Sequence, residues 1–180
     1  EKTVDLINDT FHDSGSVNVD GARIKCWKSG GHGSQTYLQV VQNSCNPGFV
    51  SLGNKLGKEK LFKYINKFGF GEKTGIDLLG ESKGIVFDVN KIGNVELATS
   101  SFGQGNSVTA IQLINAASAA VNGGNLNQPT ILYGIGNSMT NDVIYQNFPI
   151  FKRKVISEET SKKVANSLEY VASLGFGRIM

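Results

Sequence analysis

A chain of 180 residues is long enough for one domain with a buried core, and a division into two domains is not expected. The formal charge of +3, from 18 Lys plus Arg against 15 Asp plus Glu, is too small to indicate nucleic-acid binding. No run of apolar residues approaches the ~18 that a membrane-spanning helix needs, and two cysteines exclude a disulfide-stapled miniprotein.

Residues 1–33 are rich in Asp, Asn, Ser and Gly and are predicted to form exposed β structure and loops. Residues 17–24 carry a short alternating stretch around Asp20-Gly21, a pair that favours tight turns between strands. A β-hairpin that turns at Asp20-Gly21 is therefore expected.

Two helices joined by a polar turn are predicted next. Ser34 is a candidate N-cap for a helix over 35–43, in which the apolar side chains fall on one stripe. Because the residue before a proline avoids the α region, Pro47 predicts a turn at Ser44-Cys45-Asn46. The second helix is expected around residues 48–56.

Three more helices are predicted downstream. An amphipathic helix over 58–68 ends at Gly69, and a terminal helix opens at Ser157. The glycines between residues 71 and 84 punctuate short strand-like pieces. Residues 97–141 hold no Asp, Glu, Lys or Arg, so much of this stretch is expected to be buried or to line a cavity, with a central helix over 109–121.

Two short polar segments carry candidate chemistry, each with a structural alternative. Ser44-Cys45-Asn46-Pro47 places a hydroxyl and a carboxamide where both could face one cleft, and the alternative is a turn that caps a helix. In Ser101-Phe102-Gly103-Gln104-Gly105 two glycines allow another group to approach the backbone, and the alternative is an ordinary turn. The second segment matches neither a phosphate-binding loop nor a dinucleotide fingerprint.

A third pattern gathers side chains of the types that bind zinc. They are Cys26, His32 and Cys45, with His12, Asp13 and Asp20 near them in the sequence. The short C-x-x-C pairing of many zinc sites is missing, so structural thiols and a surface histidine are the alternative.

Two strings match the K-[ST]-G element of penicillin-recognising serine enzymes: Lys28-Ser29-Gly30 and Lys73-Thr74-Gly75. Such enzymes also need a nucleophilic serine in an S-x-x-K element. No Ser in this chain has Lys three positions later. Either the match is accidental or the chain is a piece of such an enzyme, and we favour the second interpretation.

Five motifs in one order carry a resemblance to class B penicillin-binding proteins. They are residues 26–33 (CWKSGGHG), residues 43–47 (NSCNP), FGFG at 68–71 with TGIDL at 74–78, residues 101–105 (SFGQG) with Thr109 and Gln112, and residues 121–124 (VNGG). The resemblance covers roughly residues 5–172 and is closest to the group that makes spore-cortex peptidoglycan. Five motifs in the family's order make a chance match improbable. From Ala172 on, the sequence is expected to depart from the family.

The resemblance implies an α/β (α+β) fold, namely a fragment of the penicillin-binding transpeptidase and serine β-lactamase-like fold, mainly its helical lobe, over residues 1–180. In the family the S-x-x-K serine lies upstream of these motifs and the true K-T-G strand downstream. Motif order therefore makes neither Lys28-Ser29-Gly30 nor Lys73-Thr74-Gly75 the catalytic strand. Residues 1–180 are expected to be inactive alone.

For the complete protein the resemblance implies a D,D-transpeptidase that crosslinks peptidoglycan stem peptides by acyl transfer and is trapped by β-lactams. It implies a location on the extracytoplasmic face of the cell membrane, an anchor outside this chain, and partners in cell-wall synthesis. No cofactor is required for acyl transfer.

The resemblance also implies roles for individual residues. Ser44 would relay protons between a catalytic lysine and the leaving amine, and Asn46 would hold that lysine and the substrate's amide side chain. Some family members with the same Cys…His…Ser-Cys-Asn pattern hold zinc beside the active site. This implies a closed structural zinc site of Cys26, His32, Cys45 and Asp13, with Asp20 and His12 as alternatives for the fourth ligand. Gly103-Gln104-Gly105 would be structural support.

Two other hypotheses stay open. The chain could be a zinc-stabilised binding module that kept the cleft and lost the chemistry. A serine β-lactamase is weaker, because the surroundings of Trp27 and Phe102 look like those of the synthases.

Overall fold

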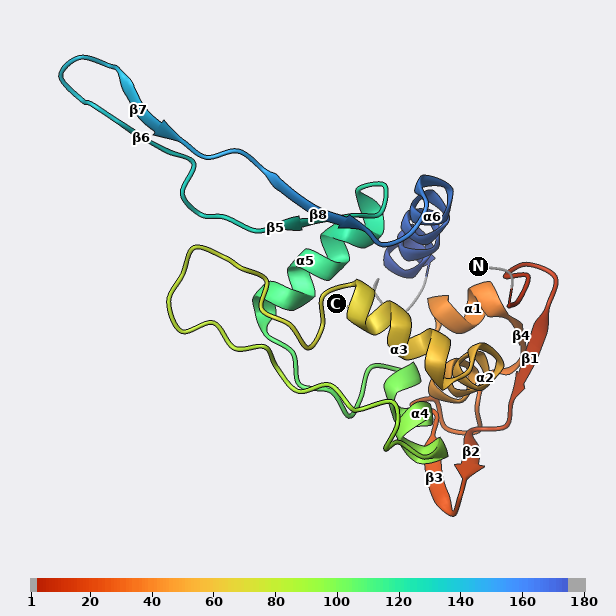
Figure 1. Ribbon diagram of the computed structural model, residues 1–180. Coiled ribbons are helices and arrows are strands. Elements are labelled where there is room, and N and C mark those ends of the chain that lie inside the picture. Colours follow the sequence, from red (N-terminus) through yellow and green to blue (C-terminus); the bar gives the residue numbers. More distant parts are fainter. Residues whose placement is uncertain (1–2, 175–180) are drawn as a thin grey trace.

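The computed structural model describes residues 3–174 as a helical body from which a two-stranded ribbon projects (Figure 1). In chain order the elements are β1 (Thr10–Asp13), β2 (Ser16–Val19), β3 (Ala22–Lys25), β4 (Gly33–Thr36), α1 (Tyr37–Gln42), α2 (Asn46–Leu56), α3 (Lys58–Lys67), α4 (Asn94–Ser101), α5 (Ala110–Val121), β5 (Asn125–Gln128), β6 (Gly134–Gly136), β7 (Val143–Gln146), β8 (Ile150–Lys154) and α6 (Glu158–Leu174). The strands form four antiparallel pairs: β1 with β4, β2 with β3, β5 with β8 and β6 with β7. Within residues 3–174, none of the helices has the length and apolar composition needed to cross a bilayer.

The predicted hairpin is confirmed by β2 and β3, in which Val19 lies opposite Ala22. Asp20 and Gly21 have φ values of 48° and 85°, and positive φ at both central residues is what a type I′ turn requires.

The predicted N-cap at Ser34 is wrong. Residues Gly33–Thr36 form β4 against β1, and α1 begins only after Thr36. The Thr36 hydroxyl accepts from the Gln39 N–H while the Gln39 side chain accepts from the Thr36 N–H, a reciprocal cap. Pairing with a strand distant in sequence therefore decides the conformation of Ser34, which local pattern cannot show.

The helices α2 and α3 agree with the prediction within two residues. Phe62 is the buried anchor of α3, and Gly69 ends the helix region with a φ of 89°. The apolar core is divided into three small clusters of buried side chains: Cys26, Tyr37, Val40 and Cys45; Val19, Val50 and Ala98; and Ala119, Leu126, Val155 and Ile156.

The strand-like pieces predicted around the glycines at 71–84 are wrong. Residues 70–93 hold one isolated bridge, between Ile85 and Ser107, and otherwise turns and irregular backbone. Side chains satisfy this backbone instead of a neighbouring strand. The Glu81 carboxylate accepts from the N–H groups of Thr74 and Gly75 and from the Thr74 hydroxyl.

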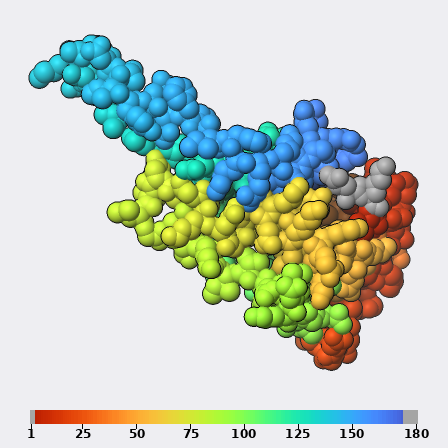
Figure 2. Space-filling view, in the orientation of Figure 1, coloured from red at the N-terminus to blue at the C-terminus, as the bar shows by residue number. Residues whose placement is uncertain are grey.

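The central helix α5 is confirmed, with Thr109 as its N-cap. Buried Gln112 donates from Nε2 to the carbonyl oxygens of Glu72 and Lys83, which fixes the irregular segment against the helix. The prediction that much of the charge-free stretch is buried is only partly right, because Leu113 and Ile114 are exposed and every residue from Thr130 to Asn141 is exposed. The last part of the charge-free stretch lies in the ribbon, which projects from the body instead of packing into it (Figure 2).

The terminal helix α6 is confirmed, with Glu158 and Glu159 in its first turn paired to Lys162 and Lys163. Ser161 is buried and donates to the Ala120 carbonyl, which ties the start of α6 to the end of α5. Leu168, in the second half of α6, is 47% exposed.

Candidate active-site turn and metal centre

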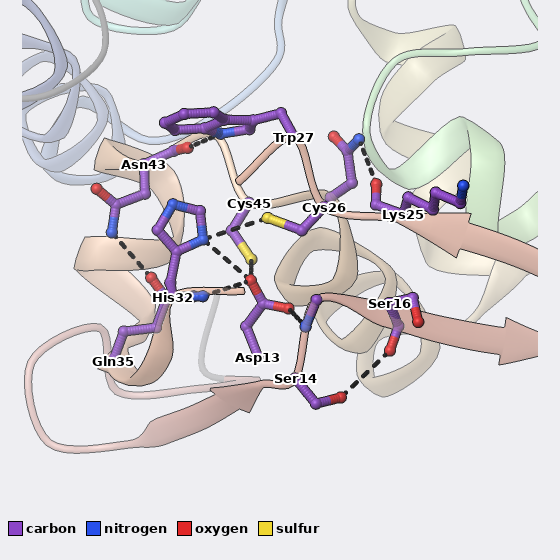
Figure 3. A network of polar contacts seen from close by, with 12 residues as sticks. Asp13, Ser14, Ser16, Lys25, Cys26, Trp27, His32, Gln35, Asn43 and Cys45 are labelled. Atoms are coloured by element: carbon purple, nitrogen blue, oxygen red, sulfur yellow. Dashed lines mark hydrogen bonds and ion pairs between the residues drawn. The ribbon is translucent and has the colours of Figure 1, made fainter. Parts of the chain in front are cut away.

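Four potential metal ligands converge where β1, the loop after β3 and the α1–α2 junction meet (Figure 3). Asp13 ends β1, Cys26 follows β3, His32 precedes β4 and Cys45 is the N-cap of α2. One ligand atom from each lies within 4.8 Å of the other three. His12 and Asp20 are not in this group: His12 contacts the Ser34 hydroxyl and Asp20 accepts from the Asn94 amide. Asp13 is thus the carboxylate that the fold supplies.

The donor set fits a tetrahedral zinc ion. His32 Nδ1 lies 3.3 Å from Cys26 Sγ and 3.0 Å from Asp13 Oδ2, and Cys45 Sγ lies 3.3 Å from the same oxygen. Zinc bonds of ~2.0–2.3 Å at tetrahedral angles place ligand atoms roughly 3.3–3.8 Å apart, so expansion by a few tenths of an ångström would admit the ion. One feature departs from the usual pattern: His32 Nε2 is buried and has no hydrogen-bond partner among the described residues, whereas a ligating imidazole commonly donates from its second nitrogen.

The electrostatics of the cluster favour a cation. Burial alone would raise the pKa of Asp13, but hydrogen bonds from Cys26, Gly15 and His32 outweigh it and hold that pKa well below its usual range. Burial raises the pKa of Cys45 to about 12 and also raises that of Cys26, and the Asp13 charge adds to both shifts. Both thiols are therefore protonated at neutral pH in the metal-free protein, and a bound metal would displace their protons.

Gly31 allows the loop that carries His32 to close over β1. Its φ is 78°, and a Cβ at this position would overlap the Asp13 carbonyl oxygen and the Gly15 nitrogen. The backbone N–H of His32 can then donate to Asp13 Oδ2 at 2.9 Å. Nothing in the local pattern indicated this close approach apart from the glycine pair itself.

The Ser44 turn connects α1 directly to α2. The N–H of Ser44 donates to the Val41 carbonyl, and Ser44 has a φ of 48°, a left-handed conformation that is uncommon for a residue with a side chain. Cys45 is completely buried, whereas Ser44 is exposed and Asn46 is half-buried. The predicted turn is therefore present, and it brings Ser44 and Asn46 to the surface on either side of a buried ligand.

Two hydrogen bonds join the segment that carries Cys26 to the Ser44 turn: one involves the residue before Cys26 and the other the residue after it. The Asn46 amide donates to the Lys25 carbonyl at 3.2 Å, and the Trp27 indole N–H donates to the Asn43 carbonyl at 2.7 Å (Figure 3). The Trp27 ring also meets the His32 ring edge-on, with centroids 5.3 Å apart. The candidate metal ligands and the turn residues therefore belong to one hydrogen-bonded unit. No sequence pattern indicates these two contacts.

The remaining candidate segments lie in loops and turns. Neither Lys28-Ser29-Gly30 nor Lys73-Thr74-Gly75 lies on a strand. Gly103 and Gly105 follow the end of α4 with φ values of 84°, as a glycine turn requires. A cavity of about 460 Å³ next to α2 is lined by Phe11, Val17, Pro47, Val50, Ser51, Asn54 and Lys55, and thus by neither Ser44 nor Asn46.

Comparison with known proteins shows the family of this chain. Residues 2–179 match the family described as the penicillin binding protein transpeptidase domain. The chain belongs to this family. The family match continues through residue 179, so the prediction that the sequence departs from the family at Ala172 is wrong. Residues 175–180 lie outside the described residues.

Individual relatives of this transpeptidase domain agree in sequence and fold. Stage V sporulation protein D of Bacillus subtilis (strain 168) is 58% identical over 178 residues, which are 99% of this chain and 28% of that protein. The D,D-transpeptidase domain of a peptidoglycan glycosyltransferase from Eggerthella lenta superposes with a TM-score of 0.86 at 21% identity, covering 98% of this chain and 45% of that one. Penicillin binding protein 3 of Mycobacterium tuberculosis, solved in complex with ampicillin, gives a TM-score of 0.80 at 25% identity over 95% of this chain and 37% of its own. The mixed α/β fold is therefore that of part of a transpeptidase domain, and the chain spans about a quarter of the length of its sporulation relative.

Proposed function

We propose that this chain is the segment of a peptidoglycan D,D-transpeptidase that carries the Ser-x-Asn turn and a structural zinc site. The main support is the turn itself: in a chain that matches the transpeptidase family from residue 2 to 179, Ser44 and Asn46 flank a buried ligand in a bonded unit. Residues 1–180 are then one part of a domain whose S-x-x-K and K-T-G elements come from a longer polypeptide.

In the proposed reaction Ser44 moves protons and does not form a bond to the substrate. The serine of the S-x-x-K element attacks the penultimate D-Ala carbonyl, and the bond to the terminal D-Ala breaks. The proton taken from that serine passes by way of the lysine and Ser44 to the amine of the leaving D-Ala. The amine of a neighbouring strand then attacks the acyl-enzyme, and its proton returns along the same groups. A β-lactam would acylate the same serine.

Asn46 is proposed to hold the lysine and the amide of the substrate. Its Nδ2 already donates to the Lys25 carbonyl, so the side chain has one fixed contact that orients it at the start of α2. A half-buried, oriented carboxamide suits a positioning role, because little rotamer freedom remains to be lost when substrate binds.

Zinc is proposed as a structural metal held by Asp13, Cys26, His32 and Cys45. Four protein donors leave no position for an activated water, so the metal would stabilise the Ser44 turn and take no part in acyl transfer. For the longer protein, relationship to Stage V sporulation protein D supports a role in spore-wall synthesis at the extracytoplasmic face of the membrane, with stem peptides as substrate and other cell-wall synthesis proteins as partners.

Acylation kinetics of the longer polypeptide with a fluorescent penicillin test this proposal. Ser44→Ala should lower the second-order acylation rate by ~10²–10⁴-fold, the usual contribution of a positioned proton-transfer group. Ser29→Ala, at an exposed hydroxyl in the neighbouring loop, should leave the rate unchanged. Equal rates for the two variants would remove Ser44 from the mechanism. Absence of labelling in a folded, zinc-loaded longer polypeptide would favour the non-catalytic binding module, and rapid turnover of the penicillin would favour a β-lactamase.

A further inference from the structure

The outer part of the ribbon is an exposed apolar arm, here defined as residues 130–147 with strands β6 and β7. It projects away from the helical body in both views (Figures 1 and 2). Every arm residue except half-buried Asn147 is exposed. Eleven of the 22 exposed large apolar side chains of the described residues lie in the arm and the start of β8: Ile131, Leu132, Tyr133, Ile135, Met139, Val143, Ile144, Tyr145, Phe148, Ile150 and Phe151. Soluble monomers rarely expose apolar side chains at this density without a partner.

Within residues 3–174, nothing pairs with the outer edges of the arm, and the side chains on both of its faces are exposed. Ile135 lies opposite Tyr145, so these side chains share one face with Tyr133, which is two residues before Ile135. Among the described strands, β6 and β7 pair only with each other, so each has an unpaired outer edge. An exposed, uncharged strand edge is a template for pairing with another chain.

The base of the arm is fixed to the body by one carboxylate. Asp77 accepts from the Thr130 hydroxyl at 2.8 Å and from the N–H groups of Ile131 and Leu132 at 2.8 and 3.0 Å. The Asn147 amide donates to the same Thr130 hydroxyl at 2.7 Å, which joins the two strands at the base. A direction fixed in this way reduces the conformational entropy that binding would cost.

Charged residues in the ribbon lie only near the tip of the arm and in β8. Residues 129–151 contain one charged residue, Asp142 near the tip, and the cationic run Lys152-Arg153-Lys154 follows in β8, beyond the base of the arm. Arg153 is paired with Glu72, whereas the Lys152 ammonium donates to the carbonyl oxygens of Lys73 and Thr74 and has no acidic partner among the described residues. The ten residues from Asp142 to Lys152 span at most ~33 Å, the length of a fully extended chain; they comprise β7, the start of β8 and the irregular residues 147–149 between them.

We propose that the arm is a dimerisation element that pairs with the arm of a second copy of this chain. The two arms lie antiparallel about a two-fold axis, β edge to β edge, with the aromatic and aliphatic side chains of one arm against those of the other. This orientation brings Asp142 near the tip of each copy to Lys152 in β8 of the other copy. The strands between these charged residues carry no charge. Two identical strands can therefore pair without the repulsion that like charges would cause.

Other occupants fit less well. A hairpin that enters a membrane has an apolar tip, whereas residues 137–142 at this tip are polar apart from Met139. The eleven apolar side chains expose on the order of 10³ Å² in total, and burial of most of that area by two arms would approach the ~800 Å² per partner of a standard interface. Opposite charges at Asp142 and Lys152 give the ribbon self-complementarity that a chance apolar surface lacks.

Sedimentation velocity of the 180-residue chain over a concentration series tests the proposal, with Tyr145→Lys against Tyr170→Lys as matched variants. Tyr145 on β7 is 46% exposed and Tyr170 on α6 is 44% exposed, so both changes add one surface lysine in place of an equally exposed tyrosine. We expect a monomer–dimer equilibrium that Tyr145→Lys weakens at least ~100-fold in Kd and that Tyr170→Lys leaves unchanged, with circular dichroism confirming that both variants fold. A folded chain that stays monomeric to ~100 μM, well above the Kd of stable interfaces of this size, would overturn the proposal.

The orientation is tested by Asp142→Lys. It should weaken the dimer about tenfold at low ionic strength and less at 0.5 M salt, because an exposed ion pair is screened. An unchanged Kd would refute the arrangement of Asp142 against Lys152. Association that survives Tyr145→Lys but is lost on Leu113→Lys would locate the contact on α5, and binding of the monomer to anionic phospholipid vesicles through the arm would identify lipid as the occupant; either result would overturn the proposal.

Discussion

Gly30 and Gly31 have the same φ of 78° but different surroundings. A Cβ on Gly30 would meet nothing within 4 Å, whereas one on Gly31 would overlap the backbone at Asp13 and Gly15. Gly30→Ala should therefore cost only the left-handed backbone penalty of ~1–2 kcal/mol. Gly31→Ala should cost clearly more, because the loop that carries His32 must move.

Urea unfolding of the two variants, together with zinc titration, measures this difference. The expected result is a larger loss of stability and weaker zinc binding for Gly31→Ala alone. Equal losses would mean that the loop closure at Asp13 contributes nothing to the metal centre.

The metal centre itself can be tested by replacing one ligand and one near neighbour. Cys26→Ser should reduce bound zinc from about one equivalent per chain to well below one, because a hydroxyl is a poor zinc ligand. His12→Gln should retain about one equivalent, since His12 contacts Ser34 and lies outside the cluster. Metal analysis of the purified protein measures both, and zinc retained by Cys26→Ser with loss from His12→Gln would replace the proposed ligand set.

The composition of this site was largely predictable, but its internal bonding was not. Cys26, His32, Cys45 and Asp13 were expected together because residue type and family pattern indicate them, while Asp20 and His12 could be set aside only from the fold. The contacts of Trp27 and Asn46 run to backbone carbonyls, and a carbonyl leaves no signature in a sequence.

At the scale of the elements, Asp77 connects an irregular loop to the base of the ribbon. The N–H groups of Ile131 and Leu132 and the Thr130 hydroxyl lower the pKa of Asp77 to about 2. A carboxyl whose folded pKa lies below its usual value near ~3.9 stabilises the folded state above that value. Its contribution should be lost as the pH falls through about 2.

Asp77→Asn should remove this charge without changing the size of the side chain. Hydrogen exchange at the amides of Ile131 and Leu132 should then accelerate several-fold at neutral pH, while exchange at Leu126 in the buried core stays unchanged. Acceleration at both places would indicate a general loss of stability, and no acceleration would show that Asp77 does not hold the ribbon.

Helices were predicted better than strands, for a physical reason. The patterns of α2, α3, α5 and α6 are local, and caps such as Thr109 and stops such as Gly69 lie next to the segments they end. The pairing of β1 with β4 and of β5 with β8 depends on partners about 20 or more residues away. The Glu81 contacts that replace strands in 70–93 are likewise determined by the folded chain.

At the scale of the whole molecule, α5 exposes apolar side chains as the arm does. Leu113 and Ile114 on α5 are 57% and 61% exposed, although this helix has a largely apolar sequence. The double variant Leu113→Gln, Ile114→Lys should lower light scattering on heating, because it removes an exposed apolar patch. It should change the free energy of unfolding by less than ~1 kcal/mol, since neither side chain is in the core. Unchanged scattering, or a large loss of stability, would show that α5 is already well covered.

The central claim is that the Ser44 turn works with an acylating serine supplied by a longer polypeptide. Intact-protein and peptide mass spectrometry after incubation with a penicillin tests it most directly. The longer polypeptide should carry one acyl adduct, on the serine of an S-x-x-K element, and the 180-residue chain should carry none. An adduct on any serine within residues 1–180 would contradict the account.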